Sequence, residues 1–424
     1  MTSVVIAGAG LAGVACAHKL ASAGVDVVLV DRNDYHQFQP LLYQVATSQL
    51  PAEDVARPLA AIFAKQPNVR LIQSEIVDID FRSRSLTTGE GETVTGHYLV
   101  LAAGACANFF GTPGAAEHSF PLYSIVDAER LRLHVRSMLE TRSGPLDVVV
   151  TGGGPTGVET AGAFAELFAA LRTMEHAGGA ADVYLVNHGD ALLAPFSERS
   201  HKYAFEKLTE HGVKVKLGVG VSKIEAGSVQ LSDGTVLATQ TTVWAGGESA
   251  SPVAHECGVA PGHGGRIDVT ADLTVDGYWG VYAIGDVANI HDGEGKTLPQ
   301  LGSVAQQSGV WAAENIIREI TDKDRKPFHY KDKGIMAMIG RGAAIAEVGE
   351  HRHHIHGPVA CAAWLGVHAA LLSGAHSKVD AFMSWAWDYM DRDHAALVEC
   401  HGDPKRIAWE DDKKPTLSTV RPPR

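Results

Sequence analysis

The hydrophobic positions of this chain follow the same pattern twice, once from residue 4 and once from residue 148. Each copy begins with a short β-branched run (4–7 and 148–151) and continues through a glycine-rich turn into a helical segment (14–23 and 158–171). A second apolar run follows in each copy (25–30 and 182–186). Two buried strands joined by a helix are typical of βαβ units, so the pattern predicts an α/β fold with parallel sheets.

Both turns have the spacing glycine-x-glycine-x-x-glycine, at Gly8, Gly10 and Gly13 and again at Gly152, Gly154 and Gly157. Glycines at this spacing let the backbone approach a pyrophosphate at the helix N-terminus, where unpaired N–H groups and the helix dipole favour negative charge. We therefore expect two dinucleotide sites in one chain.

The residues that end the second strand of each copy differ. Asp31 follows the run 25–30 at the distance where an acid meets a ribose hydroxyl. Asn187 and His188 follow the run 182–186, so the second copy has neither a carboxylate for the ribose nor an arginine for a 2′-phosphate. The preference between NADH and NADPH stays open from this position.

Other apolar runs also end in glycine. The runs 98–103 and 242–245 stop at Gly104 and Gly246, and the run 281–284 stops at Gly285 and Asp286. A carboxylate at such a strand end suits a sugar-alcohol hydroxyl of a flavin. A long helix is expected over 301–320.

Capping signals predict another helix between the two nucleotide units. Ser124 is expected to cap it, with Asp127 as the acid of a capping box. Leu131, Val135 and Met138 lie on one face of this segment, which leads into the second unit.

Composition and charge narrow the class of protein. The 424 residues, 45% of them hydrophobic, can form two or three domains with substantial cores. A net charge of -13 argues against nucleic acid as a partner and gives no general attraction to an anionic membrane. The first strand begins directly after Met1-Thr2, without a secretory signal, so a cytoplasmic location is expected. The apolar run 359–372 is too short to span a bilayer.

The cysteine and histidine positions give little support for a metal site or for dithiol chemistry. The five cysteines, Cys16, Cys106, Cys257, Cys361 and Cys400, include no close pair, which favours neither a zinc site nor a dithiol relay. The histidine-rich stretch 350–356 is flanked by charged residues, so we interpret it as a solvated hairpin or loop and expect no metal.

The first fingerprint with Asp31, the second fingerprint and the strand 283–286 together resemble the two-dinucleotide-binding flavoproteins, over residues 1–320. Finer motifs resemble the type II NADH dehydrogenases: the segments 33–46, 156–159 and 330–341, then 363–365 with His368, and 385–389. The C-terminal matches are specific, since most pyridine nucleotide-disulfide reductases have a different domain there.

This resemblance implies a glutathione-reductase-like fold of two Rossmann-like domains, for FAD and NAD(P)H, with a small C-terminal α+β region. The implied limits are 1–115 and 266–327 for the FAD domain, 116–265 for the inserted NAD(P)H domain, and 328–424 for a membrane-association or dimerisation region. The implied activity passes a hydride from NADH to FAD and two electrons on to a quinone.

The resemblance also assigns roles to single residues. Glu159 and Gln307 become the catalytic candidates, and Gln307, Ser303, Pro40 and Met338 become the quinone-site candidates. Glu159 also has a structural interpretation as an acid compensating the helix dipole, and Gln307 as a solvent-facing helix residue. The chain departs from the family where Ser303 replaces a glutamine and Asn187 replaces an acid. FAD is assigned to Gly8, Gly10, Gly13, Asp31, Gly104, Gly285 and Asp286, and NAD(P)H to Gly152, Gly154, Gly157, Asn187 and Gly246.

Two other functions remain open from the sequence. The first is a soluble FAD-dependent NAD(P)H oxidoreductase with an acceptor other than quinone, which Ser303, Asn187 and the polar C-terminus favour. The second is a redox-responsive binding protein without turnover, because the fold by itself does not fix a function. Peripheral contact with the inner face of the plasma membrane and pairing of two chains are further expectations that follow from the resemblance.

Overall fold

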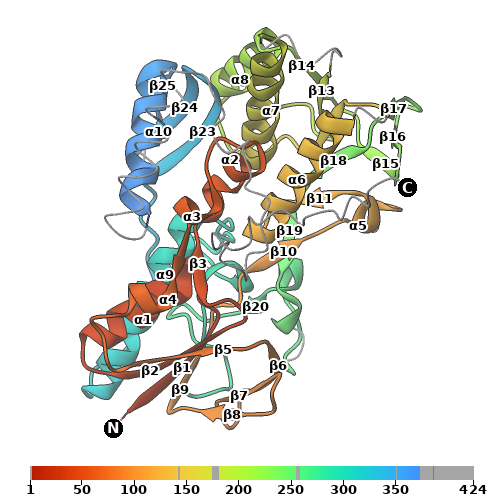
Figure 1. Cartoon of the computed structure of the whole chain (residues 1–424). Coiled ribbons are helices and arrows are strands. Elements are labelled where there is room, and N and C mark those ends of the chain that lie inside the picture. Colours follow the sequence, from red (N-terminus) through yellow and green to blue (C-terminus); the bar gives the residue numbers. More distant parts are fainter. Residues whose placement is uncertain are drawn as a thin grey trace, which may run out of the picture.

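Two five-stranded parallel sheets organise the computed structural model, one in each half of the molecule (Figure 1). The structure describes residues 2–141, 144–173, 181–254, 258–349 and 351–372 together with Trp385. The strand orders are β21-β9-β1-β2-β5 and β11-β18-β12-β13-β14. In both sheets the strand before the glycine turn is central and pairs with the second strand of its own βαβ unit. The predicted α/β class is confirmed.

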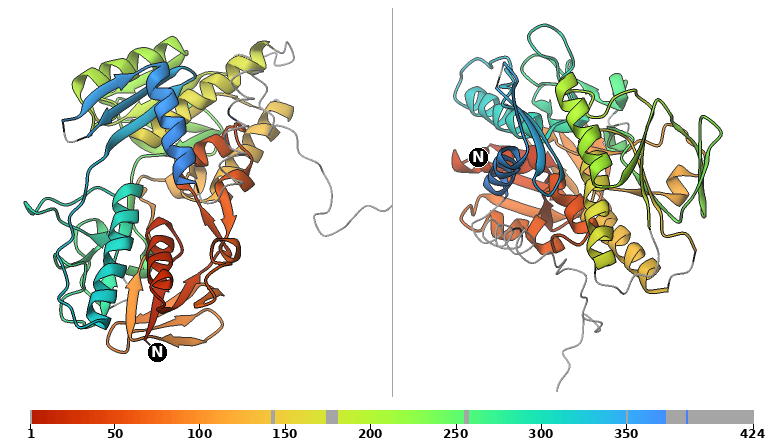
Figure 2. Two further views of the ribbon diagram at one scale, coloured as in Figure 1. Left: turned by 90° about the vertical axis from the view of Figure 1, so that its left-hand side faces the viewer. Right: turned by 90° about the horizontal axis from the view of Figure 1, so that it is seen from above.

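The first sheet combines distant segments of the chain. Its strands are β1 (Ser3–Ala7), β2 (Asp26–Asp31), β5 (Val69–Gln73), β9 (Tyr98–Leu101) and β21 (Val281–Ala283). Pairing of Val281 with Leu99 shows that the chain returns to this sheet after the second sheet is complete. Helices α1 (Leu11–Ser22) and α9 (Gly302–Ile320) lie side by side against it (Figure 2), and α9 confirms the helix expected over 301–320.

The second sheet consists of β11 (Phe120–Pro121), β12 (Val148–Thr151), β13 (Val183–Asn187), β14 (Val213–Leu217) and β18 (Thr241–Trp244), with α6 (Ile125–Thr141), α7 (Pro155–Thr173) and α8 (Glu198–Glu210). The capping box that starts α6 is confirmed. The Ser124 hydroxyl accepts a hydrogen bond from Asp127 N at 3.1 Å, and Asp127 Oδ2 accepts one from Ser124 N at 2.9 Å. Leu131, Val135 and Met138 form the buried face of α6.

Short elements connect these sheets. The first half also contains β3 (Tyr35–Gln37), η1 (Gln39–Leu41), α2 (Leu42–Ala46), α3 (Ala52–Val55), β4 (Ala56–Pro58), α4 (Leu59–Ile62), β6 (Ile76–Asp80), β7 (Ser85–Thr88), β8 (Thr93–Thr95), β10 (Ala105–Ala107) and α5 (Ala115–His118). Later come β15 (Val221–Glu225), β16 (Ser228–Leu231), β17 (Val236–Ala238), β19 (Glu248–Ala250), η2 (Pro252–Ala254), η3 (His263–Gly265), β20 (Ile267–Asp268), η4 (Gly285–Val287) and β22 (Ala288–Asn289).

A small antiparallel sheet follows near the C-terminus, as the α+β expectation required. It contains β23 (Gly334–Gly340), β24 (Ala343–Val348) and β25 (His353–His356), and α10 (Pro358–Leu371) packs on it. The carboxylate of Glu347 on β24 accepts hydrogen bonds from Ser197 N at 2.8 Å and from the Ser200 hydroxyl at 2.6 Å. This bond pattern holds the N-terminus of α8 to the C-terminal sheet.

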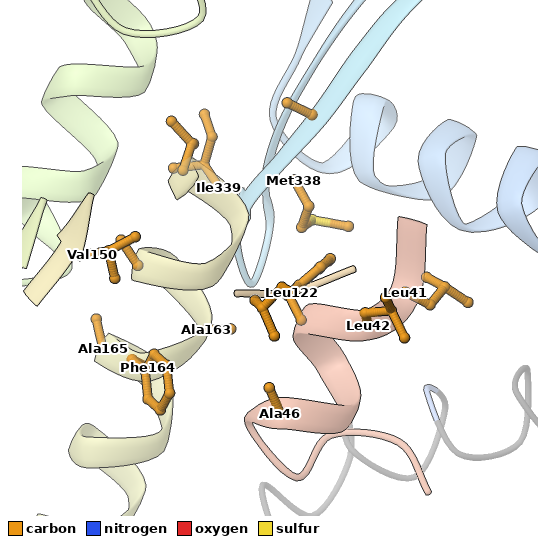
Figure 3. Close-up of a cluster of buried hydrophobic side chains, with 14 of the residues drawn as sticks. Leu41, Leu42, Ala46, Leu122, Val150, Ala163, Phe164, Ala165, Met338 and Ile339 are labelled. Atoms are coloured by element: carbon orange, nitrogen blue, oxygen red, sulfur yellow. The ribbon is translucent and has the colours of Figure 1, made fainter. Parts of the chain in front are cut away.

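One apolar core joins α2, α7 and β23, although these elements are distant in sequence. Leu42, Ala163 and Met338 all belong to this buried cluster (Figure 3). Gly162 brings α7 and β23 together, since a Cβ at this position would strike the carbonyl of Ile339. No helix within the described residues is both long and apolar enough to cross a membrane.

The expectations for residues 386–389 and for the polar terminus 405–424 fall outside the described residues, as do Glu350 and the thiols of Cys257 and Cys400. The histidine-rich stretch is a hairpin, as expected, because β25 pairs with β24. Among the described residues, no group of three or more histidine, cysteine or carboxylate side chains could hold a metal ion.

Candidate redox site

The first glycine turn has open space only at its middle glycine. Gly8 has φ +106°, and a Cβ there would strike the Ala102 carbonyl. A Cβ on Gly13 would in turn strike the carbonyl of Gly8, where the start of α1 meets the strand. A Cβ on Gly10 would meet nothing within 4 Å, so this is where a ligand can approach the backbone. Gly8 and Gly13 therefore allow the close packing of the turn, and Gly10 leaves its backbone accessible to a ligand.

Asp31 binds the turn itself. Its Oδ2 accepts a hydrogen bond from Ala9 N at 2.6 Å, and its Oδ1 accepts one from Asn33 N at 2.8 Å. The buried His36 completes the arrangement, because its Nδ1 lies 2.9 Å from the Ala9 carbonyl oxygen. Burial lowers the pKa of His36, so its neutral form donates this bond. Both polar groups of the Ala9 residue, N–H and C=O, are thereby fixed, and each Asp31 oxygen retains a lone pair for a ribose hydroxyl.

Asp286 lies at the carboxyl end of β21, beside the same turn. Gly285 has φ +67°, its Cβ position lies 2.9 Å from the Ala12 side chain, and its N–H donates to the Ser308 hydroxyl at 3.0 Å. The Oδ1 atom of Asp286 is buried without a hydrogen-bond partner among the described residues. Burial raises the pKa of Asp286 to about 6, and the nearby Arg266 opposes this shift.

These features fit FAD. The open backbone at Gly10 suits the pyrophosphate, Asp31 suits a ribose, and the unpartnered Asp286 oxygen suits a hydroxyl of the flavin chain, since buried acceptors without partners are rare. Gly104, at the end of β9, has φ +69° with open space beyond its Cα. The site therefore lies along the carboxyl edge of the first sheet, where ligands of such sheets bind.

The second glycine turn repeats the geometry of the first. Gly152 has φ +108° beneath the Ala245 carbonyl, a Cβ on Gly157 would strike the Gly152 carbonyl, and Gly154 is open. Gly246, after β18, lies against the Trp244 ring, with 3.2 Å between the ring and a Cβ at Gly246. The second turn therefore has the shape that a second dinucleotide pyrophosphate requires.

Asn187 occupies the position that Asp31 has in the first unit. Its Oδ1 accepts a hydrogen bond from Gly153 N at 3.0 Å, while its Nδ2 donates to Gly189 O at 3.1 Å and Ala191 O at 2.9 Å. A carboxylate cannot donate these two bonds. Asn187 thus holds the loop that follows β13. The sequence pattern did not predict this structural role.

Glu159 is buried at the junction of the second unit and the C-terminal sheet. It lies on α7, only 9% exposed, and its Oε1 accepts a hydrogen bond from Met338 N at 3.0 Å. Burial raises the pKa of Glu159 to about 8, while the Met338 N–H and the neighbouring Trp364 indole work against this shift. At neutral pH the carboxyl therefore holds a proton that it can give away.

Gln307 and Ser303 lie one turn apart on α9 and bind the segment that leads into β23. The Gln307 amide donates to Lys331 O at 3.1 Å and accepts from Lys331 N at 3.0 Å. The Ser303 hydroxyl lies 2.9 Å from that of Tyr330. Gln307 is therefore bound to backbone rather than facing solvent alone. Pro40 is the middle residue of the η1 turn, which leads directly into α2, and α2 packs against α7.

Several titratable residues near these elements were not singled out by the sequence. Tyr43 is buried on α2, in a segment noted only as a family motif, and Glu166 follows Glu159 by seven residues on α7. Glu248 lies on β19, where burial and the nearby Asp286 raise the pKa of its carboxyl to about 7. The seven-residue helical spacing of the two glutamates was the one available signal.

Comparisons with known proteins agree with this geometry. Residues 2–309 match the family model described as pyridine nucleotide-disulphide oxidoreductase. The type II NADH:quinone oxidoreductase Ndh of Mycobacterium tuberculosis is 34% identical over 93% of this chain and 89% of its own length. The type II NADH:quinone oxidoreductase of Staphylococcus aureus is 29% identical over 80% of this chain and 87% of its own length.

Solved structures share the fold. NDH2 from Plasmodium falciparum in complex with NADH superimposes with a TM-score of 0.84 at 18% identity, covering 92% of this chain and 98% of that one. The sulfide:quinone oxidoreductase from Aquifex aeolicus gives a TM-score of 0.74, also at 18% identity, over 96% and 100% of the two chains. With the two glycine turns and the curated relatives, these findings place the chain in the type II NADH:quinone oxidoreductase family, within the pyridine nucleotide-disulphide oxidoreductases.

Proposed function

We propose that this protein oxidises NADH and reduces a quinone, with FAD between the two substrates. The burial of the Glu159 carboxyl, which raises its pKa to about 8, is the observation that carries this proposal beyond family membership. Glu159 lies two residues beyond Gly157 in the second nucleotide turn and also contacts β23, so one acid touches both the nicotinamide half and the C-terminal sheet. Quinone reduction consumes protons, and such a group can donate one.

In this proposal one set of residues binds FAD and a second set binds the dinucleotide donor. FAD, when bound, supplies the two-electron chemistry that side chains lack. Asp31, Asp286, Gly104, Gly285 and the first glycine turn would hold it. The second turn, with Gly246 and Asn187, would hold the dinucleotide donor.

The acceptor side of the site requires a separate set of residues. Glu159 would give its proton to a quinone oxygen. Pro40, Met338, Ser303 and Gln307 would form the walls of the quinone site. Ser303 and Gln307 also support this site from α9 through their bonds to residues 330 and 331.

The domain limits also belong to the proposal. We assign 1–115 and 266–327 to FAD binding, 116–265 to the nicotinamide donor and 328–424 to association with a membrane or a second chain. Support comes from the two sheets, because β21 joins the first sheet although the whole second sheet precedes it in the chain.

We also propose that the protein attaches peripherally to the inner face of the plasma membrane. The outer face of α10 exposes Val359, Val367 and Leu371, with Val359 68% exposed. Exposed apolar patches of this kind mark interaction surfaces. Flotation with anionic liposomes tests membrane binding, and sedimentation at several protein concentrations tests the pairing of two chains.

Anaerobic stopped-flow tests the central proposal. Flavin bleaching is followed with NADH and separately with NADPH, and its recovery is followed after addition of a short-chain quinone. Fast bleaching and fast recovery are the expected result. Fast bleaching without recovery would instead indicate an FAD-dependent reductase with a different acceptor.

Glu159→Gln should leave bleaching by NADH unchanged and slow recovery by quinone about 100-fold, the usual range for loss of a general acid. In the unmodified protein the recovery rate should fall as pH rises through about 8, since the proton on Glu159 is lost there. Glu314→Gln, at an exposed position of a surface ion pair, is the matched control. Unchanged recovery in Glu159→Gln would remove this residue from the mechanism.

A further inference from the structure

Phe110 combines an exposed ring with a backbone conformation that phenylalanine rarely adopts. Its φ is +49°, in the left-handed region, and its side chain is 66% exposed. A bulky residue with positive φ costs stability, and an exposed ring recovers little of that cost through burial. Residues held in such conformations cluster at ligand-binding and active sites. The neighbours of Phe110 therefore indicate its role.

Three hydrogen bonds fix the segment that carries Phe110. The Phe110 N–H donates to Asn108 Oδ1 at 2.9 Å, which closes a turn through the asparagine side chain. The Asn108 N–H donates to Gly247 O at 3.1 Å, and the Trp244 indole donates to Asn108 O at 2.9 Å. Residues 108–110 are thereby attached to the end of β18 and to the residues that follow it.

The rings of Phe109 and Phe110 have different neighbours. The Phe109 ring lies 5.5 Å from that of the buried Trp244 and packs against the same apolar cluster. The Phe110 ring instead covers Gly247, because its Cε2 and Cζ lie 2.9 Å from the point where a Cβ on Gly247 would stand. Since a Cβ is only about 1.5 Å from its Cα, the edge of the ring contacts the Gly247 backbone.

Gly246 and Gly247 border the second glycine turn. A Cβ on Gly152 would lie 2.9 Å from the Gly246 Cα, so Gly246 is a direct neighbour of that turn. The Gly247 carbonyl also accepts a hydrogen bond from the Tyr123 hydroxyl at 3.0 Å, which fixes this backbone. A continuous backbone surface without side chains therefore leads from the turn to the ring of Phe110.

The strand order of the second sheet decides which half of the donor reaches this surface. β12 lies between β18 and β13. The glycine turn after β12 takes the pyrophosphate, and the ribose of the adenosine half is bound at the end of the second strand, here β13. The other half of the dinucleotide must then extend to the opposite side, over the end of β18. Gly246, Gly247 and Phe110 lie on that side.

We propose that Phe110 binds the nicotinamide riboside half of the donor, which packs against the phenyl ring over Gly246 and Gly247. The identity of the donor rests on the proposed function, whereas the place of Phe110 follows from its own contacts. A phenyl ring gains from contact with a second flat ring, and the nicotinamide of NAD⁺ is also a cation, which an aromatic face attracts. The ring is exposed because its partner arrives only with the donor.

The first test compares a ligand that contains the nicotinamide riboside half with one that lacks it. Calorimetric titration of the oxidised, flavin-loaded protein gives the Kd of NAD⁺ and the Kd of ADP, which carries adenosine and pyrophosphate only. Phe110→Ala should raise the Kd of NAD⁺ by about tenfold and leave the Kd of ADP within about twofold. Phe205→Ala on α8 removes another exposed phenylalanine and should change neither value.

A structural role for Phe110 makes a different prediction, which Phe110→Gly tests. Glycine adopts positive φ without steric cost, so this variant removes both the ring and the strain. If the ring serves the donor, Phe110→Gly should unfold at a temperature at least as high as that of the unmodified protein and still bind NAD⁺ about tenfold more weakly. If the ring serves the fold, the same variant should unfold at a lower temperature. Phe110→Tyr keeps an aromatic ring and should retain NAD⁺ affinity within about twofold.

Stopped-flow gives an independent readout. The NADH concentration for half-maximal bleaching should rise about tenfold in Phe110→Ala, while reoxidation of its flavin by quinone stays unchanged. Unchanged affinity for NAD⁺ and NADH in Phe110→Ala, or equal losses for NAD⁺ and ADP, would overturn the proposal. An unmodified protein that binds NAD⁺ but does not reduce quinone would contradict the proposed function alone, and the comparison of NAD⁺ with ADP would still decide the role of Phe110.

Discussion

The two nucleotide units share one backbone design at the glycine turn and differ in the residue that ends their second strand. In both, the first glycine adopts positive φ beneath a carbonyl, the third packs against the first, and the middle one is open. In both, the residue at the end of the second strand accepts a hydrogen bond from the backbone N–H after the first glycine. Asp31 is acceptor only, whereas Asn187 also donates to two loop carbonyls. The shape of the glycine turn is therefore common to both units, and the hydrogen-bonding capacity of the strand-end side chain distinguishes them.

The largest expected effect comes from filling the third glycine of either turn. Gly13→Ala should give protein that purifies with at least about tenfold less flavin, because the added methyl strikes the Gly8 carbonyl and overpacking costs about 1–3 kcal/mol. Gly157→Ala should retain flavin and lose bleaching by NADH to a similar extent. Absorbance of the purified variants and stopped-flow with NADH measure the two losses. Equal flavin loss in both would contradict the separation of the sites.

The next effect concerns Asp286, the buried carboxyl that follows β21 in the first unit. Its pKa is about 6 in the folded protein and near 3.8 when exposed, so the protonated form favours the folded state. The free energy of unfolding of flavin-free protein should fall as pH rises between these values. Asp286→Asn should remove this dependence, gain up to about 3 kcal/mol at pH 8, and bind FAD more weakly. Urea unfolding of both proteins at pH 4 and pH 8 measures the pH dependence of stability. A pH dependence that is unchanged in Asp286→Asn would contradict the role of this carboxyl.

Exchanging the strand-end residue of the second unit should have a smaller effect. Asn187→Asp sets a carboxylate against the carbonyls of Gly189 and Ala191 and removes two donated bonds, which should lower the free energy of unfolding by about 1–3 kcal/mol. Thermal and urea unfolding measure the change, with the exposed His188→Asn as control. A variant as stable as the unmodified protein would show that the loop does not depend on the amide.

The reciprocal exchange should have the smallest effect. Asp31→Asn retains one acceptor for Ala9 N and replaces the oxygen that faces Asn33 N by an amide group that can only donate, so FAD affinity should fall by about fivefold, equivalent to roughly 1 kcal/mol. Flavin titration of the apoprotein measures the affinity. A loss as large as that of Gly13→Ala would show that charge, and not the open backbone, dominates FAD binding.

The sequence determined the features that depend on local pattern. The spacing of apolar runs and glycines predicted both βαβ units, because a buried strand followed by a glycine turn and a helix leaves few alternatives. Ser124 and Asp127 predicted the start of α6, since a capping box involves only neighbours in the chain. The family was recognised from motifs that span most of the chain, and the relatives confirm it.

Tertiary structure decided what depends on contacts between distant segments. The pKa of Glu159 rises because α7, β23 and α10 enclose it, and no local pattern encodes that burial. The unpartnered oxygen of Asp286 and the loop bonds of Asn187 likewise arise from packing. Sequence fixes which groups are present and how they repeat, whereas the solvation and partners that set their chemistry depend on segments brought together only by folding.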